Sequence, residues 1–159
     1  TYHADQLTAL AQAAAESPRL RAHMNVHEVL EAPVQRLFVA TEPDTYMRPH
    51  RHSAANKWEF FMILEGQLDL MLFEADGRLR ERVPMSPNQT RAIEVPPGTW
   101  HAYACQQSGT LALEIKEGPY VPTPETDFAP WAPAEGADGA AAYRDWMRTA
   151  EEGSQFPSE

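Results

Sequence analysis

The sequence contains one cysteine, Cys105, among 159 residues. No disulfide can form within the chain, which argues against a small secreted scaffold and favours a reducing, cytoplasmic environment. No apolar run approaches the roughly 20 residues that a membrane helix requires, so we expect no membrane contact. The first twelve residues lack the basic, apolar and small-residue pattern of a signal peptide.

Basic residues are also few: the chain has 13 Lys and Arg against 23 Asp and Glu, which gives a formal net charge of −10. This excess repels phosphate backbones, so we expect no nucleic-acid partner. Glycines number 8 and prolines 14. Since each proline inside a helix costs about 3 kcal/mol, the composition excludes an all-helical chain. The length fits a single domain.

Short strand-like segments, separated by turn residues, dominate the middle of the chain. They are rich in β-branched, aromatic and leucine residues, and Asp76-Gly77 is the clearest hairpin turn. The predicted strands cover residues 34–40, 45–52, 57–64, 67–74, 78–83, 90–95, 100–106 and 110–116. Eight short strands at regular intervals predict an all-β jelly-roll barrel.

Other structure is expected at both ends. A short helix with Asp5 as its N-cap should end at Ser17-Pro18. Residues 118–139 carry five prolines and should form an extended arm across the body, followed by a helix over 140–151. We therefore divide the single domain into a lead-in (1–33), a barrel (34–117), and an arm with a C-terminal helix (118–159).

Three histidines and one glutamate have the spacing of a metal site. His50 and His52 lie two apart in a predicted strand, so they share one face. Glu59 lies near the start of the next predicted strand, and a Pro-Pro-Gly turn places His101 near the start of another. Imidazole nitrogens and a carboxylate suit one divalent transition metal ion, such as zinc, iron, manganese or nickel.

These residues carry a family resemblance. His50-x-His52 with Glu59 and Gly66 resembles the first cupin motif, although the gap before Glu59 is two residues longer than usual. Residues 96–101 resemble the second motif. Cys105 stands where cupins commonly have an asparagine; as a small core residue it needs no metal role.

The order of several fragments is similar to the WbuC-type cupin-fold metalloproteins: residues 35–36, 49–52, 57–59, 114–120 and 128–133. This resemblance extends over about residues 19–148. It implies a cupin double-stranded β-helix that binds one metal ion, with Glu59 either a fourth ligand or a hydrogen-bonding neighbour. It implies no particular reaction.

Four further side chains are candidates for binding a substrate. Strand parity from His50 and His52 places Tyr46 and Arg48 on the inner face, and parity from Glu59 does the same for Lys57. Cations at the barrel mouth would suit an anionic or phosphorylated ligand. Neutralisation of nearby carboxylates explains them equally well. The full set is Arg36, Tyr46, Arg48 and Lys57.

Two functions follow from this pattern. One is a metal-dependent enzyme for a small polar or anionic molecule such as a sugar or sugar phosphate, acting as an isomerase or epimerase, or as a dioxygenase if loaded with iron. Glu59 or Lys57 would then move the proton. The alternative is a non-catalytic ligand-binding or regulatory cupin with a structural metal. An apolar outer face at Trp58, Phe60 and Met62 requires cover from the arm or a second subunit, so we expect a homodimer.

Overall fold

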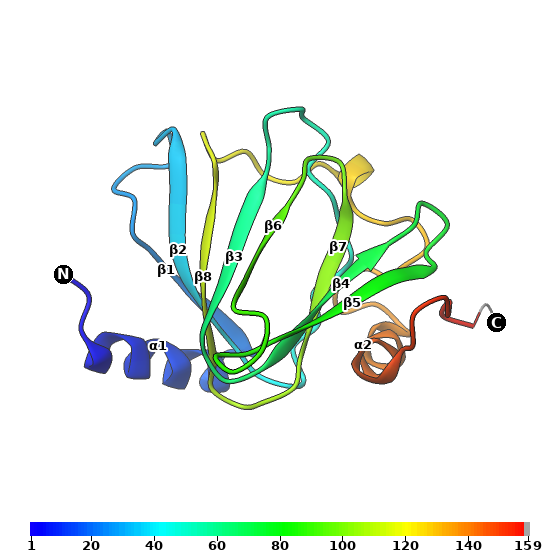
Figure 1. The fold of residues 1–159 in the computed structure, drawn as a ribbon, viewed down its shortest axis with the longest axis horizontal. Coiled ribbons are helices and arrows are strands. Elements are labelled where there is room, and N and C mark those ends of the chain that lie inside the picture. The colour runs from blue at the N-terminus through cyan, green and yellow to red at the C-terminus, as the bar shows by residue number, and fades with distance from the viewer. Residues whose placement is uncertain (158–159) are drawn as a thin grey trace.

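The computed structural model describes residues 1–157, which form two facing antiparallel sheets flanked by two helices (Figure 1). One sheet has the order β1-β2-β8-β3-β6 and the other β5-β4-β7. The helices and strands are α1 (Ala4–Glu16), β1 (Arg21–Asn25), β2 (Val34–Thr41), β3 (Glu59–Glu65), β4 (Leu68–Phe73), β5 (Leu79–Met85), β6 (Ala92–Val95), β7 (Trp100–Cys105), β8 (Thr110–Glu117), the 3-10 turn η1 (Glu125–Asp127) and α2 (Ala140–Thr149). The predicted all-β jelly roll with two flanking helices is confirmed.

The inner faces of the two sheets enclose the barrel core. Along β3, buried and half-buried residues alternate, so Phe61 and Ile63 point inward. They pack against Leu70 of β4 and Tyr103 of β7. Period-two alternation in β3 therefore fixes which residues can reach the interior, including Glu59 on the same face.

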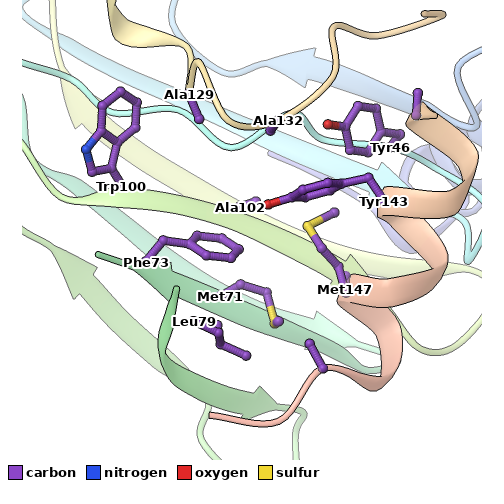
Figure 2. Close-up of a cluster of buried hydrophobic side chains, with 13 residues drawn as sticks. Tyr46, Met71, Phe73, Leu79, Trp100, Ala102, Ala129, Ala132, Tyr143 and Met147 are labelled. Carbon is purple, nitrogen blue, oxygen red and sulfur yellow. The ribbon is translucent and has the colours of Figure 1, made fainter. Parts of the chain in front are cut away.

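Each sheet is also covered on its outer face. Helix α1 lays Leu10 and Ala14 on Ala40 and Leu111 of the five-stranded sheet. Helix α2 and the proline-rich arm cover the three-stranded sheet, where Tyr143 joins a large buried cluster (Figure 2). Because both faces of β4 and β7 are covered, every residue in these two strands is buried.

The turn between β3 and β4 depends on Gly66. Its φ angle is +77°, in the left-handed region that favours glycine. A Cβ atom there would lie 2.7 Å from the Cα atom of Thr110, where the adjoining strand begins. Both the backbone angle and the close approach therefore require glycine at this connection between the two sheets.

Three local predictions are wrong. Residues 45–49 form no strand, and His50 takes part only in isolated bridges to His101 and Phe128. Pro49 is buried and has no N–H to donate to a strand ladder. Strand β1, which the sequence analysis does not predict, pairs instead with β2. Helix α1 has its N-cap at His3 rather than Asp5.

The other terminal predictions are confirmed. Residues 118–139 contain only η1 as regular structure, and α2 begins at Ala140 as expected. The arm covers the three-stranded sheet rather than the face that bears Phe60 and Met62, which stay half-buried. In the described part of the chain, neither helix has the length and hydrophobicity needed to cross a bilayer.

Candidate metal centre

Backbone hydrogen bonds join the two histidine-bearing segments. The N–H of His50 donates to the carbonyl of His101 at 2.9 Å, and the N–H of His101 donates back to His50 at 2.8 Å. The Gly98 N–H, in the turn before β7, donates to the carbonyl of His52 at 2.8 Å. These bonds bring together segments that lie about fifty residues apart in the sequence.

The four predicted metal-site residues converge on one point. One ligand atom from each of His50, His52, Glu59 and His101 lies within 4.8 Å of all the others. The Glu59 carboxylate is central: Oε1 lies 2.9 Å from His52 Nε2, and Oε2 lies 3.0 Å from His101 Nε2. Glu59 is 8% exposed and His101 5% exposed.

The ring orientations fit a metal ion. His50 Nδ1 donates to the Arg48 carbonyl at 3.1 Å, and His101 Nδ1 donates to the Thr99 carbonyl at 2.9 Å. Such bonds fix the ring and direct Nε2 toward a metal. The buried Nε2 of His52 contacts Glu59 without hydrogen-bond geometry, so it has no hydrogen-bond partner among residues 1–157. Three imidazoles and one carboxylate are suitable ligands for a cation between these side chains. Such a cation would also give His52 Nε2 the partner that it lacks.

Burial and mutual contact set the charges in the cluster. Burial, with the charge of nearby His101, lowers the pKa of His50 to about 3, so that ring is neutral. Burial alone would raise the pKa of Glu59, but the hydrogen bond from His101, the close contact with His52 and the Lys116 ammonium hold it well below its usual range. Burial opposes protonation of His101, yet its hydrogen bond to Glu59 raises the pKa of the ring. The ionised Glu59 carboxylate and the neutral His50 ring are in the form that binds a metal, and His101 would release its proton on binding one.

Two residues that the sequence analysis did not place in the site adjoin the cluster. Lys116 Nζ lies 3.1 Å from Glu59 Oε1 and also contacts the Glu114 carboxylate. Burial raises the pKa of Glu114. In the β3–β8 pairing, Glu59 faces Lys116 and Phe61 faces Glu114. Strand parity in β8 would have found both residues, had its partner strand been known.

Two of the predicted substrate-binding residues lie elsewhere. Arg36 is exposed and pairs in register with Ile115, on the face opposite Glu59 and Lys116. Tyr46 is 7% exposed within the outer core, where its hydroxyl donates to the Pro133 carbonyl at 2.8 Å (Figure 2). The parity argument failed for Tyr46 because its segment is not a strand.

The other two predicted residues line pockets that reach the cluster. Arg48 borders a pocket with His50. Lys57 borders a second pocket with His52 and Glu59, and its ammonium donates to the carbonyls of Glu117 and Pro119 at 2.9 and 2.8 Å.

Three pockets border the candidate site. One of about 220 Å³ reaches His52 and Glu59, and one of about 340 Å³ reaches His50. A smaller one of about 110 Å³ lies inside the barrel against His50, Glu59 and His101. The cluster is therefore accessible to a small molecule.

Solved structures with a similar fold are cupin-superfamily proteins. The structure of KdgF from Halomonas sp. matches with a TM-score of 0.51 and 16% identity, over 66% of this chain and 84% of that chain. A mutant salicylate 1,2-dioxygenase from Pseudoaminobacter salicylatoxidans, in complex with gentisate, matches with a TM-score of 0.57 and 10% identity, over 74% of this chain and 33% of that chain. A cupin superfamily protein from Desulfitobacterium hafniense DCB-2 matches with a TM-score of 0.48 and 14% identity, over 61% of this chain and 76% of that chain. The chain therefore has a cupin fold, and it carries a cluster that could hold a metal ion.

The family of the protein is shown by a match between its sequence and a family model. Residues 2–85, more than half of the chain, match the model described as "Domain of unknown function (DUF6016)", and the protein belongs to this family. A search of curated proteins finds no match.

Proposed function

We propose that this cupin binds one divalent transition metal ion through His50, His52, Glu59 and His101, and acts on a small polar or anionic molecule such as a sugar or sugar phosphate. The observation that carries the proposal is the convergence of three imidazoles and one carboxylate from separate segments within 4.8 Å. The pockets that reach these side chains favour a role with a ligand over a purely structural metal.

The bound ion would supply Lewis acidity, polarising a carbonyl or binding a pair of hydroxyls. The protein's own residues would orient the substrate in the pocket that Lys57 and Glu59 line. Either residue is placed to hold or move a proton in an isomerisation or epimerisation, and Glu59 serves only if it is not itself a ligand. Loading with iron would favour dioxygenase chemistry. A non-catalytic ligand-binding cupin would use the same pocket without turnover.

Metal analysis of variants tests the proposal. Protein purified without added metal should carry about one ion per chain. The identity of that ion distinguishes between the two proposed activities, oxygenase and isomerase. His50→Ala and His101→Ala should lose the ion and retain the β-sheet circular dichroism spectrum. His23→Ala provides a control, because His23 lies on β1 outside the cluster. Unchanged metal content in both cluster variants would contradict the proposal.

We also infer that the protein is a WbuC-type cupin and a cytoplasmic homodimer. The ordered fragments given above support the subtype, and the single buried thiol of Cys105 suits a reducing compartment. The half-buried side chains of Phe60 and Met62, on the outer face of β3, support association through that sheet. Light scattering should give twice the 17.8 kDa mass of the chain, and a monomer mass would remove the dimer from this account.

A further inference from the structure

The pocket of about 340 Å³ beside His50 is lined by more positive than negative side chains. Arg19, Arg21 and Arg48 contribute three guanidinium groups, and Glu135 the one carboxylate. This local excess of cations contrasts with a net charge of −10 for the whole chain. A cavity with such walls concentrates small anions.

Two of the three arginines are already neutralised in part. Arg19 Nε and Arg21 Nη2 lie 2.6 and 2.8 Å from the two oxygens of Glu135. Arg21 Nη1 also donates to the carbonyl of Tyr46 at 2.8 Å. These contacts hold the wall of the pocket in place and leave Arg48 as the cation best placed to receive a ligand.

Arg48 is held rigidly but is incompletely paired. Its Nη2 donates to the Ala129 carbonyl at 3.0 Å, and its guanidinium carbon lies 5.2 Å from the centroid of the Phe128 ring. Nη1 pairs with Glu125 at 2.9 Å, but the Glu125 side chain is 80% exposed. The buried Nε has no hydrogen-bond partner among residues 1–157.

Arg48 differs in the exposure of its partner from two other arginines, Arg82 and Arg51. Arg82 is paired with Asp69 and Arg51 with Asp127, and those carboxylates are only 4% and 5% exposed. An exposed partner contributes little to stability. A buried N–H without an acceptor is a cost that a ligand oxygen would remove.

We propose that this pocket binds the carboxylate or phosphate group of a small anionic ligand, with Arg48 as the anchor. This inference rests on the proposed function, because the same pocket ends at His50 of the candidate metal site. The guanidinium plane, fixed by Phe128 and Ala129, presents its unpartnered Nε–H and the second N–H of Nη2, on the same edge, to two oxygens of the anion. Glu125, which pairs with Nη1, competes with the anion for the charge of Arg48.

Titration calorimetry with succinate and with inorganic phosphate tests the inference and separates the two chemistries. Arg48→Gln should weaken binding of the preferred anion by about ten- to hundred-fold. Glu125→Gln should tighten it by about two- to five-fold, since a competitor is removed. Arg144→Gln is the matched control, because Arg144 lies on α2 and pairs with Asp145 away from the pocket; it should leave the affinity unchanged.

A spectroscopic measurement tests direct contact. The Arg48 Nε–H resonance, assigned by its absence in Arg48→Gln, should shift when the anion saturates the protein. No binding of either anion, equal affinities of the wild type and Arg48→Gln, or an unmoved resonance would each overturn the inference.

Repeating the titrations on chelator-treated protein separates the two proposals. Arg48-dependent anion binding by a protein that carries no metal in any preparation would contradict only the metal site. A full complement of metal with Arg48-independent binding would contradict only the anion pocket.

Discussion

The Lys116 ammonium lies between two carboxylates at the inner edge of the candidate metal site. It contacts Glu59 at 3.1 Å and Glu114 at 2.5 Å. Burial disfavours its charge, but the two carboxylates outweigh that effect and raise its pKa. The Lys116 ammonium therefore stabilises two carboxyl groups beside the histidines in the protein without a metal ion.

Removing this charge should destabilise the metal-free protein. We expect Lys116→Met to lose about 3 kcal/mol of unfolding free energy, because it leaves two buried carboxylates without their cation. Urea denaturation of chelator-treated protein measures the loss. The double variant with Glu114→Gln should recover part of it, and a coupling energy below about 0.5 kcal/mol would show that the contact is not energetically important.

The four clustered residues could be predicted from sequence because each occupies a short local motif. His50-x-His52 and the Pro-Pro-Gly turn before His101 carry their own geometry, which is independent of how distant strands pair. Lys116 could not be placed, because its position depends on the register between β3 and β8. That register depends on the packing of the whole sheet rather than on any local signal.

At the scale of elements, Arg82 attaches the end of α2 to the three-stranded sheet. Its guanidinium donates to the carbonyls of Ala150 and Arg148 at 2.6 and 2.5 Å, and to Asp69 at 2.6 Å. Last-turn carbonyls have no partner within a helix, so these bonds cap its C-terminus.

Arg82→Met should therefore release α2 as well as lower stability. We expect a loss of about 3 kcal/mol, since Asp69 would be left buried without its cation and would keep only the hydrogen bond from Gln106. Hydrogen exchange should accelerate in residues 140–149. Arg80→Met on the same strand is the control, because Arg80 is exposed; equal exchange in the two variants would contradict the role of Arg82.

Glu135 connects the proline-rich arm to the segment that leads into β1. Its hydrogen bond from Arg19, together with that from Arg21, lowers the pKa of the carboxyl. A lowered folded-state pKa contributes stability above the ordinary glutamate pKa, and that stability is lost as the pH falls through the folded-state value.

Glu135→Gln should accordingly cost about 1 kcal/mol near neutral pH, a small value because the side chain is 37% exposed. The difference between wild type and variant should shrink as the pH falls below the ordinary glutamate pKa. Thermal unfolding across a pH series measures it. A difference that does not change with pH would show that the contact acts through packing rather than charge.

Most strands could be predicted from composition and turns, and the exceptions have a common cause. Residues 45–49 look strand-like because they begin with the β-branched Thr45 and the aromatic Tyr46, yet Tyr46 packs in the core under α2. Strand β1 has exposed positions at His23 and Asn25 and little β-branched character, so only its pairing with β2 makes it a strand.

On the scale of the whole molecule, three apolar layers hold the barrel together: α1 on one sheet, the core between the sheets, and α2 with the arm on the other. The cluster of His50, His52, Glu59 and His101 consists of polar side chains and adds no apolar side chain to these layers. The barrel should therefore fold without metal, and the metal should add stability to a fold that already exists.

Chelation should lower the thermal midpoint without unfolding the protein at room temperature. A ligand that binds only the native state adds about 4 kcal/mol at a thousand times its Kd. Scanning calorimetry with and without chelator measures the shift, and His101→Ala should show none. Loss of the native circular dichroism spectrum on chelation at room temperature would contradict a preformed barrel.

The most direct test of the metal site is a crystal structure with diffraction data collected at the absorption edge of the bound metal. The account predicts a single anomalous peak about 2.0–2.2 Å from Nε2 of His50, His52 and His101, with the Glu59 carboxylate beside it. A peak elsewhere, or histidine rings that present Nδ1 rather than Nε2 to the ion, would contradict it.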